Sequence, residues 1–539
     1  MVGLDGATWD IIRPLAGEGR LPNLQKIMDH GAHGVLHSTV PPVTPAAWTT
    51  VFTGKNPGRH GIFDFQEIDR HTYEFRTLRT HRHREKTLWD LLGENGKRSI
   101  LVDVPFTYPP HPLNGLMVTG YGTPRTPDTV FTYPPDFQTV LPPELHAEIR
   151  IALPEKRFDR SQRFIDEWEN VMVGRRKLLR HLVSEEAWDF FMVVFSITDN
   201  MAHVFWTYAD TAHPNYYREE ATAFRKAFYH SYEQCDRVLG ELMEAAGDCT
   251  TLVISDHGFG SVRPRQYMFQ RLLEGRYLYA RSGKGKSRVL SDRLLSVAVN
   301  AYGRFPFLRE RIKGLQPGRR ELVKASLKKA GVMPNAAAID YARSRVIVSN
   351  FGLQLWLNES GRFAHGPVDP ADREQILAEL TAYLLSDSDP VTGRPVVLAV
   401  HRGRDVYNGP FVDECPDLIV EYTNLFNVSG EQGQKNGNLE GGHTHDGIIL
   451  ASGSAIASHK VDNASLMDLA PSILHLLGLA VPFDLDGRVL EELLGAEHRL
   501  QNPIRMSDEV ARTAASEPAS YSEEQEKEIR DQLRQLGYL

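Results

Sequence analysis

The stretch DFFMVVFSITD, residues 189–199, is an apolar run that ends in an acidic residue. Its aromatic and β-branched residues predict a strand that is buried on both faces. Three other runs share this pattern of apolar residues followed by polar or acidic ones: VGLD (2–5), RSILVDV (98–104) and TTLVISDHG (250–258). Helical patterns follow these runs. The alternation predicts an α/β fold with a doubly wound, mostly parallel central sheet and helices on both faces.

Length and composition narrow the class of protein. With 539 residues, the chain is expected to form one large α/β domain with a sizeable insertion, or two domains. Hydrophobic residues make up 41% and charged residues 24%, and the net charge is -8, so nothing points to nucleic acid as a specific partner. Three cysteines without a CxxC pair argue against a disulfide framework or a thiolate metal site. No apolar run is long enough to span a membrane and no signal sequence is evident, so we expect a cytoplasmic protein.

The pattern along the chain predicts four segments. Residues 1–264 are expected to form the first part of the α/β core, and residues 265–345 an inserted basic helical module. Residues 346–500 are expected to complete the core, and residues 501–539 to form a tail with a terminal helix. Because Asp5 follows only four residues, a few strand residues are expected to be missing before it.

The inserted module is strongly basic. Residues 281–329 contain 14 Lys or Arg residues against three Asp or Glu residues. Such a run is typical of a solvated surface, but it also suits a lid over the active site or a peripheral contact with an anionic surface.

Acidic residues at the ends of the predicted strands are the main candidates for functional residues. Asp5, Asp199 and Asp256 each follow an apolar run, His203 comes four residues after Asp199, and His257 follows Asp256 directly. In open α/β sheets, ligands bind beyond the carboxyl ends of the strands. Each residue alone is also explained as a helix cap or a turn. Together, however, three carboxylates at one sheet edge need a compensating cation, and Asp and His ligands suit zinc or another borderline divalent ion.

Five motifs, in chain order, resemble those of one family. The segments GLDGATWD, VTPAAWTTVFTGKNPGRHGIFDF, TDNMAH, SDHGFG and GGHTHDG are similar to motifs of the alkaline phosphatase superfamily, in its type I phosphodiesterase/nucleotide pyrophosphatase branch. The late stretch SLMDLAPSILHLLGLAVPFDLDGRVL resembles the C-terminal portion of the superfamily. The resemblance spans roughly residues 2–490 and implies a metal-dependent phosphoric ester hydrolase.

The resemblance also implies a set of site residues. Two divalent metal ions are expected, most readily Zn²⁺ with Mn²⁺ as the alternative: one held by Asp5, Thr44, Asp256 and His257, the other by Asp199, His203 and His443. His443 is preferred to His445 because the family pattern places the ligand directly after the glycine, three residues before an acidic residue. Ala46, Phe65 and His445 are expected to face the substrate. His60 is expected to make a structural hydrogen bond instead.

Thr44 is the expected nucleophile. The sequence Thr44-Pro45 is typical of an N-cap followed by proline at the first helical position, which would place the hydroxyl at the positive end of a helix. A threonine hydroxyl needs activation at neutral pH, and a metal together with the helix terminus would supply it. We therefore expect a two-step in-line displacement through a phospho-threonine intermediate.

The class of substrate is less sharply predicted. Monoester-specific superfamily members carry an arginine just after the nucleophile, whereas residues 45–54 contain none. A phosphodiester, a phosphoanhydride or a nucleotide-like small molecule is therefore expected. Nucleotide pyrophosphatases place an asparagine after their HGI element, where this chain reads HGIFDF, so nucleotide specificity is in doubt. A phosphonate hydrolase or a phosphotransferase could use the same site, while the C/S-x-P-x-R motif of sulfatases is absent. The non-enzymatic alternative is a scaffold that binds an anionic partner through residues 281–329.

Overall fold

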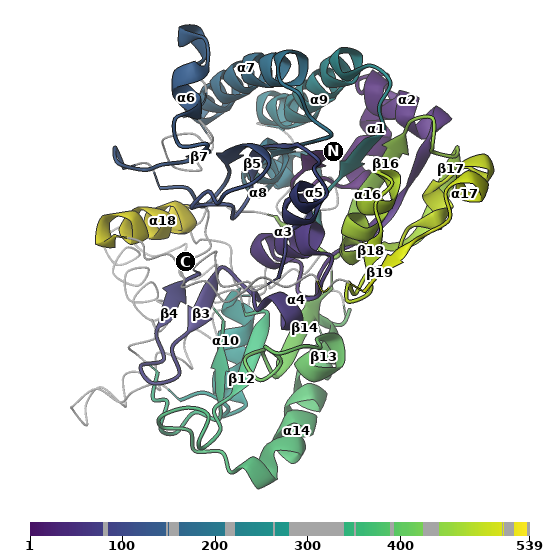
Figure 1. Ribbon diagram of the computed structural model, residues 1–539. Coiled ribbons are helices and arrows are strands. Elements are labelled where there is room, and N and C mark those ends of the chain that lie inside the picture. Colours follow the sequence, from purple (N-terminus) through teal and green to yellow (C-terminus); the bar gives the residue numbers. More distant parts are fainter. Residues whose placement is uncertain are drawn as a thin grey trace, which may run out of the picture.

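A nine-stranded sheet forms the centre of the computed structural model (Figure 1). Its strands are β1 (Val2–Leu4), β2 (Ala32–His37), β5 (Ser99–Val104), β6 (Gly115–Thr119), β7 (Thr132–Tyr133), β8 (Phe190–Phe195), β9 (Thr251–Ile254), β16 (Asp446–Ser452) and β17 (His459–Ser465). They lie in the order β17-β2-β16-β9-β1-β8-β5-β6-β7. Five neighbouring pairs are parallel and three are antiparallel. This confirms the predicted α/β fold with a mostly parallel sheet.

The structure describes residues 1–78, 85–124, 126–146, 149, 161–210, 221–261, 265–279, 339–349, 352–388, 393–423, 441–508, 510 and 522–535. Most of the predicted basic module, including residues 281–329, lies outside these ranges. The module and the predicted domain limits therefore stay predictions.

Helices cover both faces of the central sheet. On one face lie α1 (Trp9–Gly17), α2 (Pro22–His30), α7 (Gln162–Glu185), α8 (Ile197–Ala209) and α9 (Ala221–Ala246), and on the other α3 (Thr44–Thr53), α5 (Leu88–Glu94) and α16 (Leu469–Leu476). Strand β8 shows why both layers are needed. Phe191, Val193 and Phe195 belong to one hydrophobic cluster, whereas Phe190, Met192 and Val194 belong to the other. Side chains alternate along a strand, so a continuous apolar run has two faces to bury.

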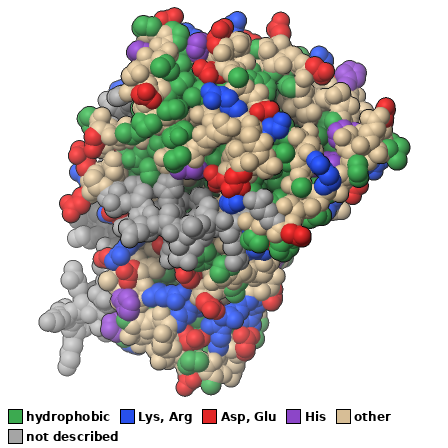
Figure 2. Space-filling view, viewed as in Figure 1, with side chains coloured by type: hydrophobic (Ala, Val, Ile, Leu, Met, Phe, Trp, Pro, Cys, Tyr) green, Lys and Arg blue, Asp and Glu red, His purple; other side chains and the backbone are tan. Residues whose placement is uncertain are grey.

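A second sheet lies below the central one in the view of Figure 1. Its strands β11 (Val346–Val348), β12 (Gln354–Leu357), β13 (Val397–Arg402) and β14 (Leu418–Tyr422) are all antiparallel and lie in the order β11-β12-β14-β13. They share a separate hydrophobic cluster with α10 (Arg265–Glu274) and α14 (Arg373–Leu385). On the face shown in Figure 2, basic and acidic side chains lie next to one another over this part, and Arg362 pairs with Asp417 at 2.6 Å.

Shorter elements complete the described structure. They are the helices α4 (Pro57–His60), α6 (Phe137–Val140), α15 (Gly403–Val406) and α17 (Ala496–Gln501), and the strand pairs β3 (Gln66–Ile68) with β4 (Phe75–Thr77), β10 (Gly258–Gly260) with β15 (Gly442–Thr444), and β18 (Val481–Pro482) with β19 (Met506–Ser507).

The terminal helix α18 (Glu523–Gln535) begins with the predicted capping box. The Gln525 amide donates to Ser522 Oγ at 3.2 Å, and the Ser522 amide donates to Gln525 Oε1 at 3.0 Å. Of the helices in the described ranges, none combines the length and the apolar character that crossing a membrane requires.

Candidate metal centre

Three carboxylates meet at the carboxyl ends of neighbouring strands. β1 lies between β8 and β9 and is parallel to both, so the chain leaves all three strands at the same sheet edge. Asp5 directly follows β1, Asp199 lies in the first turn of α8 after β8, and Asp256 comes shortly after β9. Their exposed fractions are 3%, 5% and 0%. The structure thus brings together the strand-end residues that the sequence indicated.

Asp5, Asp256 and His257 form the first group of potential ligands. One ligand atom from each lies within 4.8 Å of the others. His257 Nε2 is 3.6 Å from Asp5 Oδ1 and 3.3 Å from Asp256 Oδ2. All three side chains are buried, so the group lies in a poorly hydrated environment.

Neighbouring groups orient these three side chains. The Trp48 indole N–H donates to Asp5 Oδ2 at 3.3 Å, and the Gly6 amide donates to Asp256 Oδ1 at 3.3 Å. His257 Nδ1 lies 3.0 Å from the Gly258 carbonyl oxygen. A hydrogen bond from Nδ1 to a carbonyl keeps Nε2 unprotonated and available to a cation.

Asp199, His203 and His443 form the second group. Asp199 and His203 are four residues apart on α8 and therefore share a helix face. Asp199 Oδ1 lies 3.3 Å from Nε2 of both His203 and His443, and the two Nε2 atoms are 3.1 Å apart. The pairing of β10 with β15 places His443 opposite Phe259, and the His443 ring stacks on His257 with centroids 3.7 Å apart. The two groups are therefore adjacent.

Burial and the neighbouring charges shift the pKa values of the three carboxylates. Burial, followed by repulsion from Asp199, raises the pKa of Asp5 to about 7. Burial and the same carboxylates raise the pKa of Asp256 well above its ordinary value. Burial raises the pKa of Asp199 too, but the adjacent imidazoles of His203 and His443 outweigh it and lower the pKa. Bound cations would relieve the repulsion.

The unsatisfied oxygens of the site fit metal ions. Among the described residues, Asp5 Oδ1, Asp199 Oδ1 and Asp256 Oδ2 are buried without a hydrogen-bond partner. Such atoms are costly unless a ligand satisfies them. The donors are carboxylate oxygens and imidazole nitrogens with no thiolate, a set that suits zinc and other divalent transition metals. The residues present therefore fit divalent cations at both groups.

Thr44 lies beside the first group, at the start of α3. Its hydroxyl is 3.3 Å from His257 Nε2, and the residue is 4% exposed. The sequence prediction that Thr44 is the N-cap is wrong by one position. Val43 is the N-cap, with φ -116° and ψ 131°, and Thr44 is already the first helical residue. The β-branched Val43, in an extended conformation, is thus the N-cap, and the Thr44 hydroxyl stays at the helix N-terminus.

The residues expected to face the substrate have different surroundings. Ala46 and Phe65 are each 1% exposed and belong to one hydrophobic cluster near Thr44. His445 belongs to neither of these two groups. With His37 and Asp446 it forms a third, more exposed set of potential ligands, in which its ring stacks on His37 with centroids 5.3 Å apart and both imidazoles approach Asp446.

Two residues at the centre were not found from the sequence. Trp48 lies one helical turn after Thr44, a spacing that could have indicated its contact with Asp5. Tyr121 follows β6, and its buried hydroxyl has no partner among the described residues. No local sequence signal marks Tyr121. The structural hydrogen bonds expected of His60 are present, with Thr50 Oγ1 at 3.1 Å and with the Ile62 amide at 3.2 Å.

A sequence model of the family described as "Type I phosphodiesterase / nucleotide pyrophosphatase" matches residues 1–446. No curated protein matches the chain in sequence.

Several solved structures are similar in fold. A multiply substituted variant of the alkaline phosphatase PafA shares 15% identity over 92% of this chain and 98% of that chain, with a TM-score of 0.50. Phosphonoacetate hydrolase from Sinorhizobium meliloti 1021, in complex with phosphonoacetate, shares 14% identity over 88% and 94%, with a TM-score of 0.49. Human ectonucleotide pyrophosphatase/phosphodiesterase 5 shares 13% identity over 92% and 99%, with a TM-score of 0.46. At these identities the likeness concerns the fold alone.

Proposed function

The chain belongs to the type I phosphodiesterase/nucleotide pyrophosphatase family and is a phosphoric ester hydrolase, and on that premise we propose that it cleaves a phosphodiester or phosphoanhydride bond through Thr44. One observation carries the proposal: the Thr44 hydroxyl lies 3.3 Å from His257 Nε2, beside two adjacent groups of carboxylate and imidazole ligands. A nucleophile in such a place can be activated at neutral pH.

The two ligand groups are assigned to two divalent cations, with Zn²⁺ preferred and Mn²⁺ as the alternative. One set comprises Asp5, Thr44, Asp256 and His257, and the other Asp199, His203 and His443. When bound, the cations would supply Lewis acidity at the attacking and leaving oxygens. The unsatisfied carboxylate oxygens of both groups support this assignment.

The chain's own groups suit a two-step displacement. Thr44 Oγ1 attacks phosphorus, a new Oγ–P bond forms, and the bond to the leaving oxygen breaks; that oxygen keeps the electron pair and takes up a proton. Water then attacks the same phosphorus, the Oγ–P bond breaks, and Thr44 regains a proton from the water. The first backbone hydrogen bond of α3 runs from Ala47 to Val43, and Pro45 has no N–H. Among the described residues, neither the Thr44 nor the Ala46 amide has an acceptor, so both can hold phosphoryl oxygens at the positive helix end.

Features of the site favour diesters over monoesters. Residues 45–54 contain no arginine that could neutralise the extra charge of a monoester. Nucleotide pyrophosphatases place an asparagine after their HGI element, where this chain reads HGIFDF, and Phe65 of that segment is buried against the aromatic ring of Phe106. This side of the site is apolar, which suits a substrate with less charge.

Substitution of the nucleophile tests the proposal. Thr44→Ala should lower the hydrolysis of bis-p-nitrophenyl phosphate on the order of a thousandfold or more, since the covalent step is lost, while zinc content stays close to that of the wild type. Thr53→Ala is the matched control, because Thr53 is a buried threonine of the same helix whose hydroxyl bonds to the Thr49 carbonyl. Substantial turnover by Thr44→Ala would refute the nucleophile assignment. A wild-type kcat/KM that strongly favours p-nitrophenyl phosphate would overturn the substrate class.

A further inference from the structure

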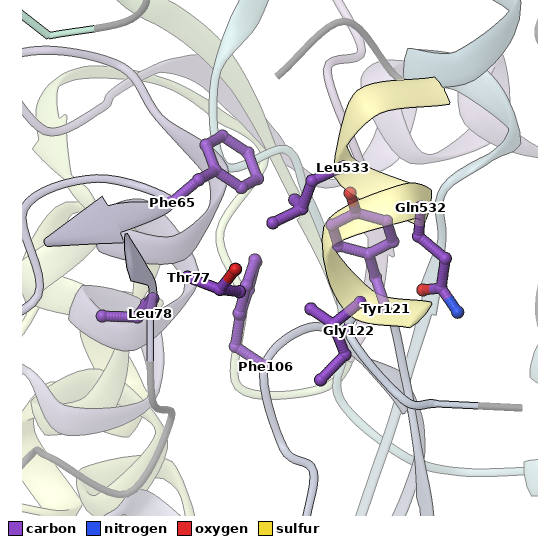
Figure 3. A pocket seen from close by; sticks show the side chains of 9 residues that line it. Phe65, Thr77, Leu78, Phe106, Tyr121, Gly122, Gln532 and Leu533 are labelled. Carbon is purple, nitrogen blue, oxygen red and sulfur yellow. The ribbon is translucent and has the colours of Figure 1, made fainter. Parts of the chain in front are cut away.

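Two features outside the two ligand groups of the candidate metal centre differ in what they could hold. One is a small cavity between α18 and the segments that follow β5 and β6, whose walls are mostly apolar side chains such as Phe65 and Leu533 (Figure 3). The other is the third ligand set of His37, His445 and Asp446, in which one ligand atom of each residue lies within 4.8 Å of the others. The third ligand set brings polar donors together, whereas the cavity is mainly a gap in apolar packing.

The distances within the third ligand set fit one shared cation. Asp446 Oδ1 lies 3.0 Å from His37 Nδ1 and 3.5 Å from His445 Nδ1. Around a tetrahedral zinc ion with bonds of about 2.0–2.1 Å, neighbouring ligand atoms lie about 3.3–3.4 Å apart. The two observed distances bracket this value, so a small shift of the side chains would admit the ion.

The central sheet holds the three residues in place. β2 and β16 are antiparallel, and their register puts His37 directly opposite Asp446, so the two side chains lie on the same face of the sheet. β17 pairs with the other side of β2, which makes β2 an interior strand. The Ser38 amide donates to the His445 carbonyl at 2.9 Å and fixes the chain beside the second imidazole. Ligands on such rigid elements are preorganised for a metal ion.

The chemistry of the donors specifies the class of ion. Two imidazole nitrogens with one carboxylate oxygen suit zinc and other divalent transition metals, whereas magnesium and calcium prefer oxygen ligands. All three side chains are partly exposed, and that of Asp446 is 64% exposed, so water can fill the other coordination positions. An ion in such an open site is held less tightly than one among the buried ligands of the candidate metal centre.

We propose that His37, His445 and Asp446 bind a third, exchangeable divalent transition metal ion, represented by Zn²⁺. The ion ties the end of β2 to the start of β16. Binding at this place does not depend on the proposed function, because it involves no step of the hydrolysis.

The proposed third site lies close in sequence to the candidate metal centre. Residues 38–43 connect His37 to Thr44, and within this segment the Pro42 carbonyl lies 3.0 Å from His443 Nδ1. An ion bound at His37 therefore fixes one end of the segment that orients the His443 imidazole.

A zinc titration of the full chain tests the third site. Gel-filtered protein that retains its tightly bound zinc is titrated with Zn²⁺ in a calorimeter, and the wild type should bind about one further equivalent. His37→Ala and, separately, Asp446→Asn remove one ligand each and should weaken this binding by about a hundredfold or more. The tightly bound zinc should stay at the wild-type amount in both variants, which shows that they are folded.

His401→Ala is the matched control. His401 Nε2 lies 3.1 Å from Glu421 Oε2, and the His401 side chain is 32% exposed, close to the 38% of His37. This pair has the same kind of imidazole–carboxylate contact, but within the described ranges it belongs to no set of three ligands. The control variant should keep the further equivalent.

The possible outcomes decide between a built site and loose surface binding. A wild type that binds no further equivalent would overturn the proposal. So would an equivalent that survives both His37→Ala and Asp446→Asn, or one that is also lost in His401→Ala. Mg²⁺ in place of Zn²⁺ should give no such equivalent, and equal binding of the two ions would overturn the assignment to a transition metal. None of these results decides whether Thr44 is the nucleophile, so the proposed function is tested separately.

Discussion

At the scale of single residues, backbone carbonyls orient the two imidazoles that stack on each other in the candidate metal centre. His257 Nδ1 lies 3.0 Å from the Gly258 carbonyl, and His443 Nδ1 lies 3.0 Å from the Pro42 carbonyl. Both arrangements direct Nε2 to the carboxylates. The proximity of the candidate ligand residues could be predicted, because their spacing and motifs are local. The contact with Pro42 could not, since it joins residues 401 positions apart and leaves no pattern in the sequence.

The choice of His443 over His445 as a ligand can be measured. His443→Ala removes one of the three donors around Asp199, so the purified protein should hold about one equivalent less of tightly bound zinc. His445→Ala is the matched control, because His445 lies with His37 and Asp446 in a separate and more exposed set, so its loss should leave the tightly bound zinc unchanged. Equal zinc losses in the two variants, measured by inductively coupled plasma mass spectrometry, would undo the assignment.

The buried carboxyl of Asp64 makes the stability of the folded state depend on pH, independently of any bound metal. The residue is 6% exposed, and burial raises its pKa to about 7 from an ordinary 3.8. The folded state therefore binds this proton more tightly than the unfolded state does, and its stability falls as pH rises from about 4 to about 7.

Asp64→Asn removes this titration. Between pH 5 and pH 8, the unfolding free energy of the wild type should fall relative to that of the variant. The change should be roughly 2–4 kcal/mol once the wild-type carboxyl is ionised. Urea unfolding at both pH values measures the difference. A difference between variant and wild type that does not change with pH would contradict the buried carboxyl account.

At the scale of elements, α3 holds the proposed nucleophile at one end, and a buried cluster of Lys55 with two carboxylates lies just beyond the other. Gly54 ends the helix with a φ of 66°, and Lys55 follows it, fully buried. The Lys55 ammonium donates to Glu85 and, at 2.8 Å, to Asp484. The cluster thus joins α3 to two segments that are remote in sequence.

Lys55→Met should be strongly destabilising, because it removes the fully buried ammonium that Glu85 and Asp484 share. We expect a loss of about 3–5 kcal/mol in unfolding free energy, measured by urea denaturation. Lys97→Met, which breaks the exposed contact with Asp189, is the control and should cost about 1 kcal/mol or less. A similar small loss for Lys55→Met would show that the buried cluster does not anchor α3.

Elements with a strong local pattern were predictable from the sequence. The apolar run at 190–195 gave β8, and Ser522 with Gln525 gave the start of α18. The start of α3 was misplaced by one residue, because Thr44-Pro45 is a typical cap sequence while the backbone of Val43 decides where the helix begins. Local propensity does not determine that choice when the first turn packs against the rest of the core.

At the scale of the whole molecule, the site is assembled from segments that lie far apart in the chain. β1, α3, α8, the segment after β9 and β15 each supply part of it. The order of the parallel strands explains why their ends meet. That a site forms where these ends meet can be predicted from the fold class alone. The separate sheet of β11 to β14 and the return of α18 to the cluster around Phe65 depend on tertiary packing. For that reason their positions could not be predicted from the sequence.

The central claim is that Thr44 carries the phosphoryl group during the reaction. The most direct measurement is to mix zinc-loaded enzyme with excess bis-p-nitrophenyl phosphate, quench in acid within milliseconds and map the peptides by mass spectrometry. The account predicts a burst of p-nitrophenol of about one equivalent per active site, if breakdown of the intermediate is the slower step, and a p-nitrophenyl phosphoryl adduct on the peptide containing Thr44. A modified peptide elsewhere, or active turnover by Thr44→Ala without any adduct, would contradict it.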